Sequence, residues 1–213
     1  MRSNKLARLL ADFARDCYDR GWMLGTSGNF SAVASRNPFR LLMTPTGADK
    51  GQLRPEQMVL VDERGIPVRG SGRPSSETRL HLAVVTVRGA GAVLHTHSVW
   101  STMLSGTWAK AGGVSIKGYE MLKGLEGVST HEHREWLPIL ENSQDIAALA
   151  SEIGEKLRAF PETHGFLLRR HGLYTWGEDF AQAKRHLEIL EFLLEVMGRS
   201  GEPPGGDSRA AFN

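Results

Sequence analysis

Two short apolar segments that each end in histidine place the strongest constraint on how this chain folds. GAGAVLHTHS predicts a strand with His95 and His97 at its end, and GFLLRRHG predicts a buried strand that ends at His171. Since successive side chains alternate across a strand, His95 and His97 lie on the same face. Gly172 follows His171 and permits close approach of another backbone. We therefore expect the functional chemistry at strand ends.

The rest of the chain has the periodicity of an α/β protein. FRLLMTPTG predicts a strand that runs into a Pro/Gly loop, and MVLVDERGIPV predicts two strands joined by a tight turn, so the sheet is antiparallel or mixed. Apolar residues at helical spacing predict helices over residues 3–20, 76–88, 143–160 and 178–198. Asn142 or Ser143 is available to cap the third helix. We expect a single domain over residues 1–200 and a mobile tail, rich in Gly and Pro, over residues 201–213.

Composition and charge limit the class of protein. The 213 residues, 40% hydrophobic and 23% charged, suit one soluble globular domain. With 26 Lys and Arg against 24 Asp and Glu, the net charge of +2 is too balanced for a protein whose main partner is nucleic acid or a membrane. Cys17 is the single cysteine, the first residues do not read as a signal peptide, and no apolar run approaches ~18 residues. We therefore expect a cytoplasmic protein.

The histidines at strand ends suggest a metal site, although other roles compete. Three neutral imidazoles leave a bound ion its full positive charge and an open coordination position, as catalytic zinc sites require. An isolated HxH pair is more often two ordinary half-buried histidines, so the third histidine, His171, decides in favour of the metal. The second HxH, His131 and His133, has no apolar strand before it and predicts a solvated loop. The remaining histidines, not assigned to metal, are His81, His164 and His186.

Three loops rich in Gly, Ser and Thr suggest an anion site. GTSGNFS, TPTGADK and RPSSET offer hydroxyl groups and backbone amides of the kind that bind a phosphate dianion. Each loop alone is typical of an ordinary turn, and only their combination with the three histidines favours phosphate binding. The candidate residues in these loops are Asn29, Thr46, Gly47, Ser75 and Ser76.

Two acidic residues are candidates for proton transfer. Glu77 follows the serine pair, and Glu120 lies in KGYEMLKGL. Such acids usually lie on the solvated surface of a protein. Lys123 stands at the spacing of an i,i+3 ion pair with Glu120. Composition alone therefore does not distinguish Glu120 from its neighbours.

The motifs GTSGN, TPTG, PSSE, HTHS and RRHG, in this order, resemble the class II aldolase/adducin family over about residues 5–198. The resemblance implies a three-layer α/β/α fold with a central, mainly antiparallel sheet, and a homotetramer. It also implies one zinc ion per subunit on His95, His97 and His171, and a small phosphorylated ketose as substrate. The positions that match phosphate-binding residues of the family are Asn29, Thr46, Gly47, Ser75 and Ser76.

The segments GYEMLKGL, LPILEN and RRHGLYTWGE resemble one branch of that family, which dehydrates 5-methylthioribulose 1-phosphate in methionine salvage. This resemblance makes Glu120 the catalytic acid/base and Lys123 a substrate-binding residue. Glu77 is then a fourth metal ligand, an auxiliary base or a helix cap. The alternatives are a zinc-dependent sugar-phosphate aldolase or epimerase of the same family, and a non-catalytic interaction module like the adducin head. The presence of all three strand-end histidines argues against the module.

Overall fold

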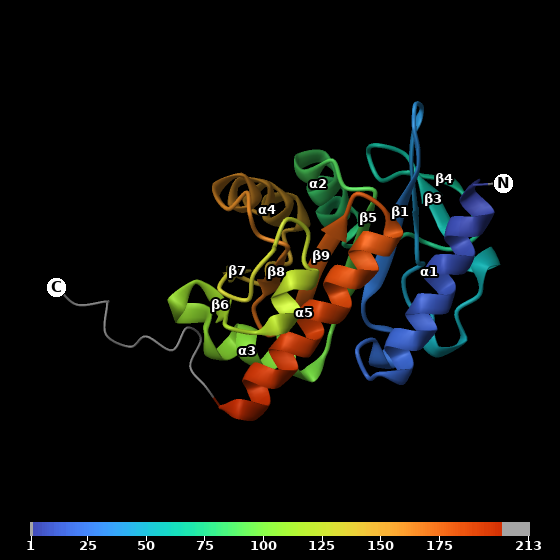
Figure 1. The fold of residues 1–213 in the computed structure, drawn as a ribbon. Coiled ribbons are helices and arrows are strands. Elements are labelled where there is room, and N and C mark those ends of the chain that lie inside the picture. The colour runs from blue at the N-terminus through green and yellow to red at the C-terminus, as the bar shows by residue number, and fades with distance from the viewer. Residues whose placement is uncertain (1, 202–213) are drawn as a thin grey trace.

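The chain folds around one central sheet (Figure 1). The computed structural model describes residues 2–201, and within this range nine strands lie in the order β4-β3-β2-β1-β5-β9-β8-β7-β6. Neighbouring strands are antiparallel except β7 and β8, which are parallel, so the predicted, mainly antiparallel sheet is confirmed. The strands are β1 (Asn29–Arg36), β2 (Phe39–Met43), β3 (Val59–Val61), β4 (Pro67–Arg69), β5 (Ala92–Thr96), β6 (Gly113–Lys117), β7 (Arg134–Leu140), β8 (Gly165–Leu168) and β9 (Gly172–Gly177).

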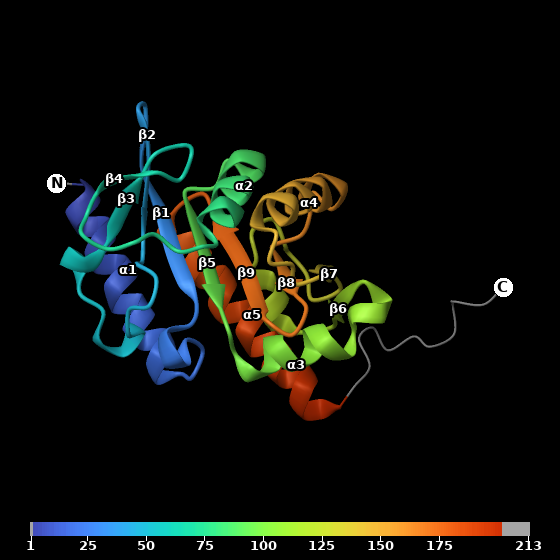
Figure 2. The same cartoon turned by 180° about the vertical axis from the view of Figure 1, so that it is seen from behind.

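Helices cover both faces of the sheet and complete three layers (Figures 1 and 2). The α-helices are α1 (Arg2–Asp19), α2 (Thr78–Arg88), α3 (Val99–Thr107), α4 (Ile146–Ala159) and α5 (Phe180–Ser200). The short 3-10 helices are η1 (Leu24–Thr26), η2 (Lys50–Gln52), η3 (Pro55–Gln57), η4 (Ala109–Ala111) and η5 (Glu120–Gly124). On one face α1, α3 and α5 share a hydrophobic cluster, and on the other α2 packs against α4. The predicted α/β/α fold is confirmed.

Strand β5 is buried on both faces, and this determines where its last side chains point. Leu94 packs in the cluster under α1 and α5, and Val93 packs in the cluster under α2 and α4. Because side chains alternate along a strand, His95 follows Val93 to the α2 side and Thr96 follows Leu94 to the α5 side. The end of β5 therefore presents different side chains to the two helical layers.

The four predicted helices are confirmed as α1, α2, α4 and α5. The cap of α4 differs from the prediction of Asn142 or Ser143, which was wrong. The side chain of Asp145 accepts the hydrogen bond from the Ala148 amide at 3.0 Å, because it directly precedes the helix. The sequence did not predict β1, β6, β7, β9 or α3. β1 and β7 are largely buried on both faces, so they lack the alternation that reveals a half-buried strand.

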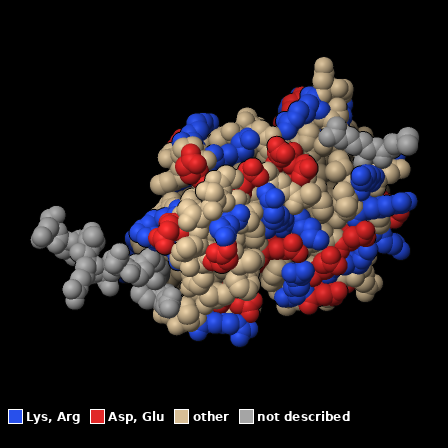
Figure 3. All heavy atoms as spheres, viewed as in Figure 1, with Lys and Arg blue, Asp and Glu red and all other residues tan. Residues whose placement is uncertain are grey.

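The surface carries charges of both signs. On the face in Figure 3, acidic and basic side chains are interspersed. No helix within residues 2–201 is long and apolar enough to span a membrane. The predicted mobile tail begins at residue 201, and residues 202–213 lie outside the described part of the chain. The single domain over residues 1–200 stays a prediction.

Candidate metal centre

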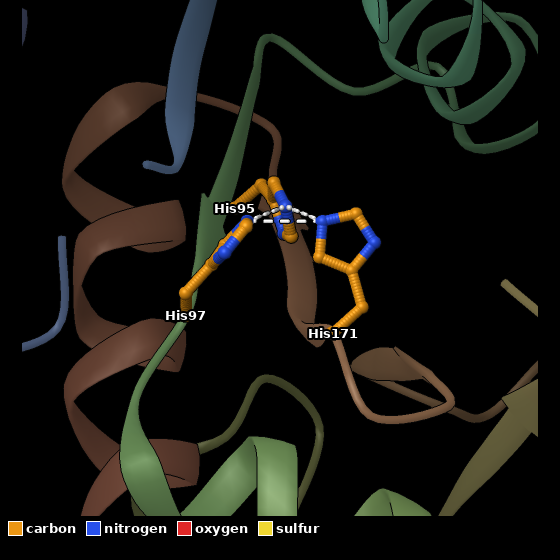
Figure 4. A group of neighbouring side chains, drawn as sticks. All are labelled: His95, His97 and His171. Atoms are coloured by element: carbon orange, nitrogen blue, oxygen red, sulfur yellow. Dashed lines mark hydrogen bonds between the residues drawn. The ribbon is translucent and has the colours of Figure 1, made fainter. Parts of the chain in front are cut away.

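Three imidazoles meet at the carboxyl end of β5 (Figure 4). His95 lies on β5, His97 follows it, and His171 lies in the turn between β8 and β9. The Nε2 atom of His97 lies 2.8 Å from that of His95 and 3.0 Å from that of His171, and the His95 and His171 atoms are 3.3 Å apart. The structure thus brings together all three histidines that the sequence assigned to a metal, and they could hold one ion.

The pairing of β5 with β9 brings His171 to the other two histidines. His95 pairs with Tyr174 across the two strands, and their rings stack with centroids 3.8 Å apart. A Cβ atom at Gly172 would overlap the carbonyl oxygen of Thr96, so the predicted close backbone approach at Gly172 is confirmed. Glycine at position 172 therefore lets β9 approach β5 closely enough to bring the imidazole of His171 to those of His95 and His97.

Helix α3 holds the turn that carries His171. Arg170 has a φ of 53°, in the left-handed region that non-glycine residues rarely adopt. Its amide donates to Ser105 Oγ at 3.0 Å, and the His171 carbonyl accepts from Thr102 Oγ1 at 3.0 Å. These two hydrogen bonds from α3 support a backbone conformation that is otherwise unfavourable.

The outer nitrogens of two of the imidazoles are held by acceptors. His95 Nδ1 donates to the Leu173 carbonyl at 2.9 Å, and His171 Nδ1 lies 3.1 Å from Asn142 Oδ1. Each proton is thereby held on Nδ1, and the Nε2 lone pair points toward the other imidazoles. Burial, with the nearby His171 and Lys50, lowers the pKa of His97 to about 4. Neutral imidazoles with converging lone pairs are metal ligands.

Glu77 supplies a carboxylate to the same point. Its Oε2 lies 3.5 Å from His95 Nε2, and its Oε1 lies 3.4 Å from His171 Nε2. Asn29 Nδ2 donates to this carboxylate at 2.6 Å, and the Asn29 Oδ1 atom in turn contacts His81. The Glu77 side chain makes no capping hydrogen bond to α2, so the role of a helix cap alone is wrong. The carboxylate is positioned as part of the histidine centre.

All five predicted phosphate-binding residues line one cavity of about 210 Å³ beside the histidines. The three loops that were selected from the sequence form its walls, and β1, β2 and α2 position them. Asn29 is the most buried of the five. Its side-chain amide donates one hydrogen bond to Glu77 and another to Ser75 Oγ, the latter at 3.2 Å. The lining residues are Thr26, Ser27, Gly28, Asn29, Pro45, Thr46, Gly47, Lys50, Ser75, Ser76, Glu77, His97 and His171.

Lys50, which was not predicted from the sequence, is the only Lys or Arg among the described residues that line the cavity. Its side chain is 1% exposed, and its Nζ donates to the carbonyls of Thr26 at 2.9 Å and Ala48 at 3.0 Å. Burial lowers the pKa of Lys50 to about 8, although Asp49 raises it. Its place in TPTGADK, three residues after Gly47, was the available signal, since a cation beside a phosphate loop suits an anion.

Glu120 and Lys123 lie outside this cavity. They lie on η5, where Leu122 belongs to the hydrophobic cluster of α5, whereas Glu77 precedes α2 on the opposite face of the sheet. The Glu120 side chain is 73% exposed and forms the i,i+3 ion pair with Lys123. Within one chain, the structure therefore does not bring Glu120 to the histidines, and its catalytic role stays a prediction.

A second group of histidines surrounds Glu135. His133 Nε2 lies 3.0 Å and His164 Nδ1 2.9 Å from Glu135 Oε2. Both residues of the second HxH lie in the predicted loop, but only His131, which is half exposed, is solvated as predicted, since the side chain of His133 is 26% exposed. β7 begins at the next residue and carries the buried Glu135 carboxylate, which draws the His133 ring inward.

The sequence profile of the family described as Class II Aldolase and Adducin N-terminal domain matches residues 8–197. The chain belongs to this family. Curated relatives include the methylthioribulose-1-phosphate dehydratases of Pseudomonas fluorescens (strain Pf0-1), 42% identical over 92% of this chain and 97% of that protein, and of Sorangium cellulosum (strain So ce56), 40% identical over 90% and 91%.

Solved structures of class II aldolase type have the same fold. The Escherichia coli protein YgbL superposes with a TM-score of 0.79 at 26% identity and covers 96% of this chain and 93% of its own. The L-fuculose-1-phosphate aldolase of Thermus thermophilus gives a TM-score of 0.74 at 24% identity, with 94% and 97% covered. The fold predicted for the class II aldolase/adducin family is thus confirmed independently of the motifs.

Proposed function

We propose that this chain is a hydro-lyase of methionine salvage that converts 5-methylthioribulose 1-phosphate into 2,3-diketo-5-methylthiopentyl 1-phosphate and water. The observation that carries the proposal is 42% identity with a methylthioribulose-1-phosphate dehydratase over 92% of this chain. The cavity supports it, because histidines suited to a metal, loops rich in hydroxyl groups and a buried lysine surround one space. A metal ion on the histidines suits the carbonyl group of a phosphorylated ketose, and the loops and the lysine suit its phosphate.

His95, His97 and His171 would hold a zinc ion, with Glu77 as a fourth group. Ligand atoms about 2.0–2.1 Å from a tetrahedral zinc ion are about 3.3–3.4 Å apart. The Glu77 oxygens, at 3.4 and 3.5 Å from histidine nitrogens, match this spacing, and the nitrogens at 2.8–3.3 Å are slightly closer. A zinc ion in this site supplies positive charge that polarises a carbonyl group of the substrate.

Lys50 and the three loops bind the substrate phosphate. Lys50 Nζ has three N–H groups, of which two are donated to backbone carbonyls, so one remains for a ligand. With its pKa at about 8, the amine is predominantly charged at neutral pH. Asn29 acts chiefly on Glu77 in the free protein, and Thr46, Ser75 and Ser76 provide hydroxyl groups toward the cavity. Lys50 thus takes the role that the sequence analysis gave to Lys123.

Glu120 removes the proton from C3 of the substrate and returns a proton to the hydroxyl that departs from C4. Since η5 and Glu77 lie on opposite faces of the sheet, Glu120 serves the cavity of a second copy. Val99 and Met103 lie one turn apart on α3, directly after the His97 loop, and both are more than half exposed. An exposed apolar pair of this kind suits a contact between subunits. We therefore propose a homotetramer with shared cavities.

The enzyme acts in the cytoplasm on a small molecule, and neither nucleic acid nor a membrane is its partner. Cys17 is buried and unpaired, which suits a reducing compartment. The interspersed charges on the face in Figure 3 suit a protein that binds its anion in a local cavity instead of on an extended basic surface.

The products distinguish a dehydratase from an aldolase. With 5-methylthioribulose 1-phosphate as substrate, the dehydratase keeps all carbon atoms in one molecule that is lighter by one water. An aldolase breaks the C3–C4 bond and releases dihydroxyacetone phosphate with a methylthio aldehyde. We expect mass spectrometry to show the loss of water and a coupled assay to detect no triose phosphate. Stoichiometric triose phosphate would establish the aldolase, and unchanged substrate with metal bound would establish the interaction module.

Mixed oligomers test the shared cavity. His95→Ala and Glu120→Gln proteins are each expected to be inactive, and they are co-expressed with different affinity tags. If one copy supplies Glu120 to the cavity of another, tetramers purified through both tags contain some cavities with both residues intact and regain part of the activity. Doubly tagged oligomers without activity would place Glu120 outside the reaction or within its own chain's cavity.

A further inference from the structure

A glutamate that the proposed mechanism does not use is buried behind the candidate metal centre. Glu191 lies on α5, is 2% exposed, and forms no ion pair within residues 2–201. Thr96 Oγ1 donates a hydrogen bond to its Oε1 atom. Burial raises the pKa of Glu191 to about 7, although Ser98 and Thr96 lower it. An unpaired carboxylate at this depth is costly to bury.

The hydrogen-bonded partner of Glu191, Thr96, lies between the two metal-site histidines of the segment HTHS. His95 and His97 point to the cavity, whereas Thr96 points to the α5 side of the sheet, where Glu191 lies. Ser98, two residues after Thr96, caps α3 by accepting the amide proton of Ser101 at 3.1 Å. One buried carboxylate therefore holds the residue that separates two of the three imidazoles in the sequence.

Thr96 also lies against the turn that carries the third imidazole. It is the last residue of β5, it pairs with Leu173, and its carbonyl oxygen occupies the space that a side chain at Gly172 would need. A rotation of the backbone at Thr96 would therefore turn His95 and His97 and displace His171 together. In Figure 4 helix α5 runs beside the strand that carries His95 and His97.

We propose that Glu191 is a positioning residue of the metal centre, which holds Thr96 from the α5 side and so fixes the strand end from which His95 and His97 reach the ion. This inference rests on the proposed metal-binding role of the three histidines. It assigns to Glu191 no contact with metal or substrate. A merely structural role, by contrast, would affect the stability of the protein and leave the affinity of the folded protein for metal unchanged.

Three variants and one control separate these roles. Thr96→Val removes the hydroxyl donor at nearly constant volume, Glu191→Leu removes the acceptor, and Glu191→Gln keeps an oxygen that accepts. Glu195→Gln is the matched control, because Glu195 lies on the same helix and is exposed in an ion pair with Arg199. The zinc dissociation constant of each metal-free, full-length protein is measured by competition with a chelator, and its thermal unfolding is measured beside it.

We expect zinc binding to weaken by about 10–100-fold in Thr96→Val and Glu191→Leu, the range known for residues that orient metal ligands. Glu191→Gln should retain most of the affinity, and Glu195→Gln all of it. Folded Thr96→Val and Glu191→Leu proteins with wild-type affinity would overturn the inference alone. A wild-type protein without zinc affinity would overturn it together with the metal site. If Glu191→Leu does not fold, Thr96→Val decides the question.

Discussion

The molecule contains two groups of histidines around a glutamate, and they are built in opposite ways. In the first group, His95 and His171 direct their Nδ1 atoms outward to oxygen acceptors, and the Nε2 atoms converge. In the second group, His133 and His164 both direct a ring nitrogen at a single oxygen of Glu135. The Nε2 atoms of the first group converge on one another, whereas the ring nitrogens of the second group converge on a carboxylate oxygen.

The direction of the pKa shifts follows from this geometry. Burial, reinforced by the other two imidazoles, holds the pKa of His95 well below its usual value. Burial also opposes charge on His164, but its hydrogen bond to Glu135 and the charge of that carboxylate outweigh it, and its pKa is raised. His164 Nε2 also faces the Glu126 carbonyl at 2.8 Å, so both ring nitrogens of a charged His164 donate. Identical residue types thus make a ligand set in one place and an ion pair in the other.

Removal of one histidine from each group gives the largest expected contrast. His97→Ala should lower the metal content from about one ion per chain to nearly none and abolish turnover, because the remaining nitrogen ligands leave a catalytic zinc site incomplete. His133→Ala should leave the metal content unchanged. Both are measured by elemental analysis of purified protein. Full metal occupancy in His97→Ala, or its loss in His133→Ala, would reverse the assignment of the two groups.

The carboxylate of the second group should matter for stability. Glu135→Ala leaves His164 without its buried partner, and breaking such a pair costs about 3–5 kcal/mol of unfolding free energy. Urea denaturation measures this change, and the metal content of the folded protein should stay constant. Glu141→Ala, which removes an exposed ion pair with Arg169, is the control and should cost at most about 1 kcal/mol. Equal losses in both variants would show that Glu135 and His164 are not a buried ion pair.

Proton transfer should depend on a carboxylate that belongs to neither group. Glu120→Gln keeps the size of the side chain but cannot exchange a proton, so turnover should fall about 100-fold or more with metal content unchanged. Steady-state kinetics and elemental analysis are measured on the same preparation. Glu77→Gln is the companion variant. An inactive Glu77→Gln protein beside an active Glu120→Gln protein would move the acid/base role into the first group.

Lys50 is the cation beside the first group, and its replacement should lower kcat/KM for the phosphorylated substrate. Lys50→Gln removes the only Lys or Arg among the described lining residues. A hydrogen bond to a charged group is worth about 1.5–3 kcal/mol, so kcat/KM should fall about 10–150-fold, mainly through KM. Kinetics with the phosphorylated and the dephosphorylated ketose measure this effect. A fall of the same size for both substrates would mean that Lys50 does not contact the phosphate.

The smallest expected effect is a pH dependence of stability that belongs to the second group. The folded pKa of His164 lies above its unfolded value, so its contribution is fully present below about pH 6.5 and is lost as the pH rises through the folded pKa. Relative to wild type, His164→Gln should therefore be least stable at about pH 6 and approach wild type as the pH rises. Urea denaturation at several pH values measures this difference. A difference in stability between His164→Gln and wild type that does not shrink as the pH rises would contradict the raised pKa of His164.

The two HxH motifs also show what the sequence can reveal. HTH follows an apolar strand and HEH does not, and this difference, together with the third histidine His171, led to the prediction that His95 and His97 bind the metal. It was not enough for His133, because its surroundings depend on Glu135 and His164, which meet only after β7 and β8 pair. Periodicity did predict the four helices, because an amphipathic stripe is a local property of the sequence.

Lys50 and Glu120 mark the limit of local patterns. A lysine is almost always exposed, so burial of Lys50 against two backbone carbonyls is a property of the folded loops alone. Glu120 and Glu77 both looked like residues of one site, and the strand order then placed them on opposite faces of the sheet. The face on which a residue lies depends on the order of the strands in the sheet, and a short sequence motif does not reveal that order.

The spacing of the three imidazoles along the chain has a consequence for biosynthesis. His171 follows His97 by 74 residues, so a growing polypeptide on the ribosome carries only two of the three ligands until the turn after β8 has been made, and His171 is positioned only once β9 has paired with β5. We therefore expect the ion to be captured by a finished sheet, so that its binding energy adds to a structure that already exists. In this respect the protein differs from small zinc domains, whose folding requires the metal. Chelators should strip the ion and leave a folded apoprotein, which can be reloaded with another metal.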